Sequence, residues 1–168
     1  CGRSLSSPRQ AASRIPPAIS VCFRFHTNFY HSYRGNSLDD RGIGRDIRII
    51  RGILRDLDAL NDAGVPVRGT WDIENYYSLQ QLIPLHAPDI LAGIQRRVGE
   101  DRDEVELMSW NNGMLSAHTP QELSRALGWA WSNPDGSGLA GLFETVAPVL
   151  RPQENMICPA QIPQLKAA

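Results

Sequence analysis

The chain has 168 residues, which is enough for one domain and too few for two domains of ordinary size. Hydrophobic residues make up 42% and charged residues 21% of the sequence, which excludes wholesale disorder, a collagen-like repeat and a coiled coil. The formal net charge of −1 argues against a dedicated nucleic-acid-binding protein. We therefore expect no nucleic acid as partner. No apolar run approaches the ~18 residues of a membrane-spanning helix, so we expect no membrane as partner either.

Residues 1–20 are rich in serine, proline and arginine and have no apolar periodicity. We expect this segment to be a disordered leader, because it buries too little apolar surface to offset the entropy of ordering. The three cysteines of the sequence are too few and too widely spaced for a disulfide framework. This use of cysteine is typical of a reducing compartment, and we predict a cytoplasmic protein.

Short apolar runs after residue 20 predict four strands, near 21–26, 67–71, 105–110 and 149–153. Helical patterns separate them at intervals of about 40 residues, an alternation that is typical of parallel βα units. A closed β/α barrel takes ~200 residues or more, so four units amount to about half of one. The predicted fold class is therefore α/β, a partial parallel β/α barrel over residues 21–168, and an open doubly wound sheet is the alternative. No glycine-rich phosphate-binding motif follows a predicted strand, so no nucleotide cofactor is expected.

The helices are predicted from apolar spacing and from the signals at their ends. A helix rich in isoleucine and leucine ends before Gly64, and Pro88 begins another. Residues 119–122 form a capping box that begins a third helix. We also expect a short helix over 139–146 and a further helix from Ile162 onward.

Polar and aromatic residues gather at the end of each predicted strand. His26 follows the first strand, Asp72 the second and Glu154 the fourth, while Glu106 and Trp110 lie in the third. Because the carboxyl ends of parallel strands meet at one edge, we expect these five side chains to converge in one cleft. Carboxylates bind hydroxyl groups and aromatic faces stack on C–H surfaces, so the cluster predicts a carbohydrate substrate. The glutamate within the apolar third strand is the strongest signal, because buried glutamate is rare unless it is paired.

The motifs FHTN at 25–28, VELMSW at 105–110 and LRPQE at 150–154 resemble the first three conserved regions of glycoside hydrolase family 57. The resemblance implies the seven-stranded β/α barrel of the glycoside hydrolase/deacetylase superfamily. It also implies retaining hydrolysis or glycosyl transfer on an α-glucan-type polysaccharide. On this interpretation, residues 21–168 are the N-terminal part of the catalytic domain, and the missing C-terminal half of that domain is their partner.

The resemblance also assigns roles to individual residues. Glu154 matches the catalytic nucleophile, His26 a histidine that lines a glucose-binding subsite, and Glu106 a glutamate that contacts the substrate. Asp72 and Trp110 are also predicted to bind the substrate, because they lie at the ends of predicted strands. The resemblance implies no metal ion and no other cofactor. The family's general acid is an aspartate from a region after the end of this sequence, so we expect the chain to be inactive alone.

Two alternatives remain open at this point. One is a metal-dependent polysaccharide deacetylase, with His26, His31 and either Asp72 or Asp39 as metal ligands, although the two histidines lack the H-x-x-x-H spacing. The other is a non-catalytic carbohydrate-binding barrel. Within this chain, Asp72 and Glu74 are the acids that would substitute for the family's general acid.

Overall fold

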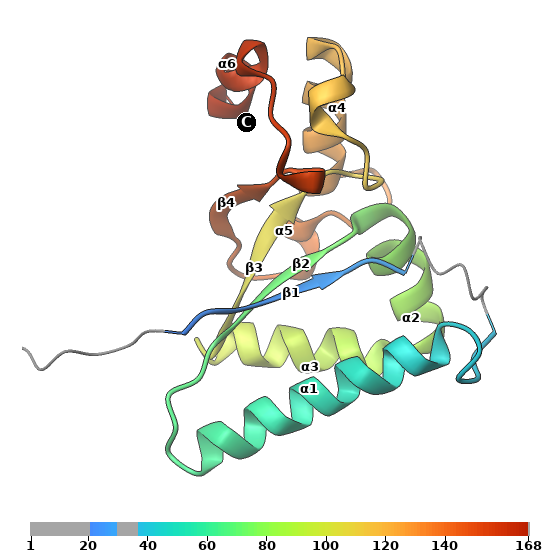
Figure 1. The fold of residues 1–168 in the computed structure, drawn as a ribbon, viewed down its shortest axis with the longest axis vertical. Coiled ribbons are helices and arrows are strands. Elements are labelled where there is room, and N and C mark those ends of the chain that lie inside the picture. The colour runs from blue at the N-terminus through green and yellow to red at the C-terminus, as the bar shows by residue number, and fades with distance from the viewer. Residues whose placement is uncertain (1–20, 30–36, 168) are drawn as a thin grey trace, which may run out of the picture.

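The computed structural model describes residues 21–29 and 37–167, so the expected leader at 1–20 lies outside the described residues (Figure 1). Four strands make one sheet: β1 (Phe23–Thr27), β2 (Gly69–Ile73), β3 (Asp103–Met108) and β4 (Ala147–Arg151). Every neighbouring pair is parallel, and the order β1-β2-β3-β4 places β1 and β4 at the edges of the described sheet. The prediction of an α/β chain with four parallel strands is confirmed, with strand ends that differ from the predicted ones by one or two residues.

Six α-helices are present in the described residues: α1 (Gly44–Asp62), α2 (Ile83–His86), α3 (Pro88–Gly99), α4 (Pro120–Trp131), α5 (Leu139–Leu142) and α6 (Ile162–Ala167). The helix predicted over 139–146 is too long. It ends at Leu142, because Phe143 has an extended backbone (φ −127°, ψ 139°) and is buried in the core.

Across 21–29 and 37–167, none of the helices combines the length and apolar character that crossing a membrane requires.

A π-helix that the sequence did not predict follows β2 directly, as η1 (Asn75–Leu82). The carboxylate of Glu74 accepts hydrogen bonds from the backbone N–H groups of Tyr77 at 3.0 Å and Ser78 at 2.7 Å. These bonds satisfy N–H groups that have no partner within the first helical turn. Because Glu74 is fully buried, this cap fixes the path of the chain at the carboxyl end of β2.

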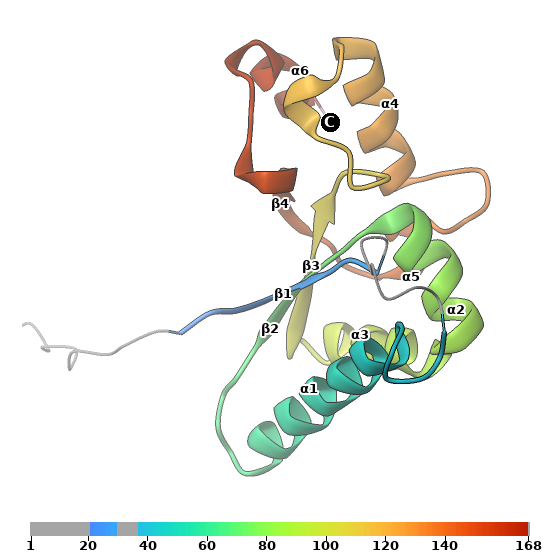
Figure 2. The same ribbon diagram turned by 45° about the vertical axis from the view of Figure 1, so that its right-hand side comes forward.

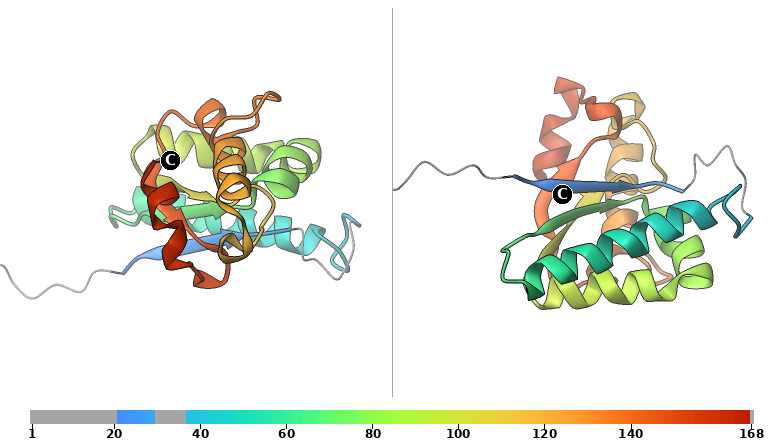
Figure 3. Two further views of the ribbon diagram at one scale, coloured as in Figure 1. Left: turned by 90° about the horizontal axis from the view of Figure 1, so that it is seen from above. Right: turned by 60° about the horizontal axis from the view of Figure 1, so that its bottom comes forward.

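The larger apolar core lies between one face of the sheet and helices α1 and α3. The strands contribute Trp71, Ile73 and Val105, and the two helices contribute Ile47, Ile50, Leu54, Leu57, Ile90, Ile94 and Val98. The helical residues recur every three or four positions, so each helix presents one apolar stripe to the sheet. The two helices run side by side (Figures 1 and 3).

Helix α4 packs on the same face of the sheet, over β3 and β4. Its Leu123 and Leu127 belong to a smaller cluster that includes Leu107 of β3 and Leu150 of β4. Alternate residues of a strand share a face, so Leu107 lies on the side of Val105 and of the larger core. Helices α1, α3 and α4 thus pack on one face of the sheet. Helices α4 and α6 lie at the other end of the molecule from α1 and α3 (Figure 2).

A buried ion pair joins α3 to the amino-terminal end of the sheet. Arg97 donates through Nε and Nη2 to the two carboxylate oxygens of Asp103, both at 2.8 Å. The same carboxylate accepts hydrogen bonds from the indole Nε1 of Trp71 and from the backbone N–H of Gly69, also at 2.8 Å. Neither charged side chain is exposed to solvent. The four donors compensate the cost of burying this carboxylate and tie β2, β3 and α3 together.

Strand β4 contains a β-bulge. Ala147 lies opposite Glu106, but Leu150 lies opposite the very next residue of β3. Residues 148–149 are therefore extra residues on β4, and the first of them is a proline, which has no N–H group to lose from the ladder. The bulge places Arg151 level with the last residue of β3.

Candidate functional site

The face of the sheet opposite the apolar core is polar, and we call it the polar face. It carries Arg24 and His26 of β1, Thr70 and Asp72 of β2, Glu104 and Glu106 of β3, and Arg151 of β4. In the parallel register, His26 lies opposite Asp72, and Asp72 lies opposite Glu106. Three of the five predicted site residues therefore form one row across three strands, near the carboxyl ends of those strands.

Asp72 is the centre of this row. It is completely buried, and its Oδ1 lies 2.6 Å from Nδ1 of His26. Its other oxygen, Oδ2, lies 3.0 Å from Nε of Arg151, in an ion pair without the alignment of a hydrogen bond. The carboxylate thus holds side chains from β1 and β4 against β2. This arrangement makes Asp72 a residue that positions its neighbours, while the partly exposed ring of His26 faces outward.

Glu106 is a buried carboxyl group with one oxygen unused. Nη2 of Arg24 donates to Oε1 at 2.6 Å, whereas Oε2 is buried and has no hydrogen-bond partner among the described residues. Burial raises the pKa of Glu106, the hydrogen bond and charge of Arg24 oppose that rise, and the neighbouring charge of Asp72 adds to it. The group can accept a hydrogen bond as a carboxylate or donate one as an acid. Either form suits recognition of a hydroxyl group.

Trp110 does not join the row, although we expected it to point into the same cleft. Its ring lies 5.6 Å from that of Tyr76 and 5.9 Å from that of Trp129, measured between centroids. The backbone N–H of Tyr76 also donates to the carbonyl of Trp110 at 2.7 Å. The predicted aromatic residue therefore belongs to a separate cluster at the carboxyl ends of β2 and β3.

Glu154 follows β4 as predicted and is exposed. Its Oε1 accepts a hydrogen bond from Nε2 of Gln153 at 2.9 Å. Its backbone is left-handed, with φ 54°. Among the described residues, the other non-glycine residues with positive φ are aspartate or asparagine, which adopt this conformation more readily: Asp101, Asn112 and Asn155. In the described part of the chain, no hydrogen bond or ion pair joins Glu154 to His26, Asp72 or Glu106, so the expected convergence with the row is not seen for this side chain.

The sequence interpretation missed two residues of the polar face. Arg24 lies within the first predicted strand and Arg151 lies within the LRPQE motif, but neither is assigned a role from the sequence. The available signal was strand alternation, because Arg24 has the same parity as His26 and therefore the same face. No such alternation predicts the contacts of Arg151, because the bulge in β4 determines which residues Arg151 can reach.

The described residues do not assemble the ligand set of the deacetylase alternative. Asp39 lies before α1, where its carboxylate accepts hydrogen bonds from the hydroxyl of Ser37 and the N–H of Arg41. His31 lies outside the described residues. Within 21–29 and 37–167, no group of three or more histidine, cysteine, aspartate or glutamate side chains is arranged to hold a metal ion. Glu74 caps η1 through both carboxylate oxygens, so it is not free to act as a proton donor.

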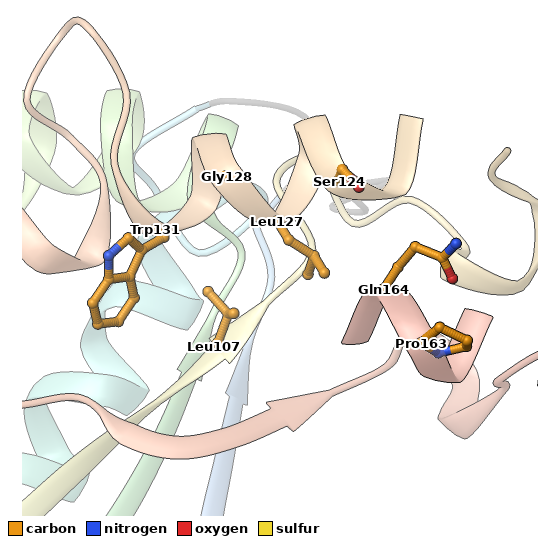
Figure 4. Close-up of a pocket in the computed structure, with 7 residues that line it drawn as sticks. All are labelled: Leu107, Ser124, Leu127, Gly128, Trp131, Pro163 and Gln164. Carbon is orange, nitrogen blue, oxygen red and sulfur yellow. The ribbon is translucent and has the colours of Figure 1, made fainter. Parts of the chain in front are cut away.

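An apolar pocket lies away from these residues, between α4 and α6 (Figure 4). Its volume is about 460 Å³, and its lining is Leu107, Ser124, Leu127, Gly128, Trp131, Pro163 and Gln164. Leu107 belongs to the apolar face of the sheet. The pocket contains none of the predicted site residues, and it opens on the side of the sheet that the polar face does not occupy.

Protein-family models, curated proteins and solved structures were compared with the chain, and none of them matches it.

Proposed function

We propose that the polar face is the substrate-binding side of an active site that acts on α-glucans, in a retaining glycoside hydrolase or glycosyl-transferring enzyme. The row of His26, Asp72 and Glu106 carries the proposal. A buried carboxyl group with an unused oxygen, beside a carboxylate and an imidazole, provides acceptors and donors for sugar hydroxyls. The four parallel strands with helices on one face fit part of a seven-stranded β/α barrel, in which the polar face would line the lumen.

In the proposed reaction, Glu154 is the nucleophile. Its carboxylate attacks the anomeric carbon as the bond from that carbon to the leaving oxygen breaks, and a second carboxylic acid gives that oxygen a proton. Water or a second sugar hydroxyl then displaces Glu154 and gives a proton back to the same acid. The two carboxyl groups of a retaining site lie ~5–5.5 Å apart. By the resemblance to family 57, the acid is an aspartate from a later region of the domain.

Glu154→Gln in the full-length native protein tests the proposal, because glutamine keeps the shape of the side chain and removes the nucleophile. Hydrolysis or transfer on maltoheptaose should fall by orders of magnitude while binding of maltoheptaose, measured by calorimetry, survives. Glu106→Gln should weaken both binding and turnover. The matched control is Glu144→Gln, at the opposite end of β4, which should leave both unchanged.

Three other outcomes would each contradict the proposal or a part of it. Full activity of Glu154→Gln would exclude the nucleophile assignment. If the unmodified protein binds maltoheptaose but does not turn it over, the enzyme hypothesis is wrong and the non-catalytic carbohydrate-binding barrel is favoured. Absence of binding to the unmodified protein would reject the carbohydrate proposal as a whole.

A further inference from the structure

Three aromatic side chains form a connected group at the carboxyl ends of β2 and β3. We call Tyr76, Trp110 and Trp129 the aromatic shelf. Successive rings meet at interplanar angles of 47° and 65°, so the shelf is angled rather than flat. Tyr76 is 40% exposed and Trp129 is 44% exposed, although large aromatic side chains favour burial. An exposed aromatic group beside a polar site is typical of a ligand-binding surface.

Backbone contacts hold the shelf in place before any ligand binds. Asn75 is buried, and its Nδ2 donates to the backbone carbonyl of Ala130 on α4 at 3.2 Å. The link between the backbones of Tyr76 and Trp110 joins the segments after β2 and β3. Cζ of Arg125 lies 5.9 Å from the ring centroid of Trp129 and completes one end of the shelf with a cation. Chain segments that are held in this way need little further ordering when a ligand stacks on the rings that they carry.

The shelf continues the polar row along the same two strands. Tyr76 comes four residues after Asp72, and Trp110 comes four residues after Glu106. Four residues span at most about 14 Å of chain. The shelf is therefore close enough to the carboxyl groups for one ligand of several sugar rings to contact both.

We propose that the aromatic shelf is a second sugar subsite, which binds an outer pyranose ring of an oligosaccharide whose reacting part lies on the polar face. This inference rests on the proposed function and adds selectivity for chain length to it. The C–H face of a pyranose stacks on Trp129 or Tyr76, and Arg125 supplies a donor for its hydroxyls. A short saccharide would occupy the polar face alone, whereas a longer one would gain the stacking contact.

Calorimetric titration with maltotriose and with maltoheptaose tests this subsite. Trp129→Ala should weaken maltoheptaose binding about tenfold, the effect of losing one aromatic stacking contact, and should leave maltotriose binding unchanged. Trp129→Phe should restore most of the lost affinity. The matched control is Trp131→Ala, because Trp131 is on the same helix and 48% exposed but lines the apolar pocket instead.

The outcomes separate this inference from the proposed function. If maltoheptaose binds the unmodified protein and Trp129→Ala matches Trp131→Ala, the subsite is wrong while the proposed function stands. If neither saccharide binds the unmodified protein, the proposed function is wrong, and the subsite inference that rests on it is wrong as well. If sedimentation shows that Trp129→Ala dissociates a dimer, the shelf is an interface between two copies of the chain, and the inference is overturned.

Discussion

The guanidinium group of Arg24 on β1 reaches across β2 to the carboxylate of Glu106 on β3, where Nη2 and Oε1 are 2.6 Å apart. Arg151 reaches inward from the opposite edge of the described sheet, across β3 to Asp72. Each buried carboxylate is thus partnered by an arginine from a strand that is not its neighbour. The two arginines supply the positive charge that burial of Glu106 and Asp72 requires.

Removing Arg24 should leave the carboxylate of Glu106 buried without its partner. We expect Arg24→Met to destabilise the fold by about 1–2 kcal/mol at neutral pH, less than for a fully buried pair, because Arg24 is half exposed and solvent screens its charge. Urea unfolding measures this change. Arg48→Met is the control, since its pair with Asp40 is exposed on both sides and should contribute little. Equal effects of the two substitutions would show that Glu106 does not depend on Arg24.

The raised pKa of Glu106 predicts a pH dependence of stability. Because the native state holds this proton more tightly than the unfolded state, stability should fall as pH rises through the interval from the ordinary pKa of glutamate to the raised one. Glu106→Gln removes the titration and should flatten this part of the profile, measured by urea unfolding between about pH 4 and about pH 8. A profile that Glu106→Gln leaves unchanged would contradict the raised pKa.

The buried carboxylate of Asp103 should contribute strongly to stability. Asp103→Ala leaves Arg97 charged, buried and without two of its hydrogen bonds, so we expect a loss of about 3–5 kcal/mol in the free energy of unfolding. The control is Asp101→Asn, two residues earlier, where the pair with Arg68 is exposed and asparagine tolerates the positive φ. That substitution should leave the urea midpoint nearly unchanged. Similar losses in both variants would contradict the importance of burial.

The capping box of α4 should also make a measurable contribution. Thr119 Oγ1 accepts a hydrogen bond from the N–H of Glu122, and the carboxylate of Glu122 accepts hydrogen bonds from the N–H and the hydroxyl of Thr119. The two bonds to the carboxylate lower the pKa of Glu122. Thr119→Ala should therefore cost about 1 kcal/mol at neutral pH. The stabilisation from Glu122 is present above the ordinary pKa of glutamate and is lost as pH falls through the lowered one, so the difference should shrink in acid. Ser124→Ala, at an exposed position on the same helix outside the capping box, is the control.

Glu154→Gly separates strain from function. Glycine adopts the left-handed conformation without steric cost, so this variant should be about 1 kcal/mol more stable in urea while losing the proposed activity. Asn155→Gly should give a smaller gain, because asparagine already tolerates positive φ. A Glu154→Gly variant that is less stable than the unmodified protein would show that its side chain holds the fold rather than the substrate.

The fold was largely accessible from the sequence, because its signals are local. Apolar runs of strand length, Pro88 and the capping box at Thr119 each act within a few residues, and the structure places β1 to β4, α3 and α4 there. Alternation likewise separates Glu106 from Val105 and Leu107. The row of His26, Asp72 and Glu106 follows once neighbouring strands are parallel.

The remaining features depend on distances that local signals do not encode. The pairing of Arg24 with Glu106 requires the order of three strands and the reach of one side chain. Trp129 meets Trp110 only because α4 packs back toward the end of β3. The π-helix after β2 depends on a buried capping glutamate, Glu74, that resembles any strand-end acid in sequence.

The number of residues in the β-bulge of β4 determines the side of the sheet on which Arg151 lies, whatever the side chains of the bulge. Two extra residues hold the end of β4 back by about 6–7 Å relative to a regular ladder. Because two is an even number, the outward and inward sides of the strand are unchanged. Loss of a single residue here would exchange the two sides and carry Arg151 into the apolar layer. Loss of both would leave a regular ladder in which Leu150 and Arg151 keep their partners Leu107 and Met108. Natural variation in the length of this strand should therefore come in steps of two residues, and loss of a single residue should be absent.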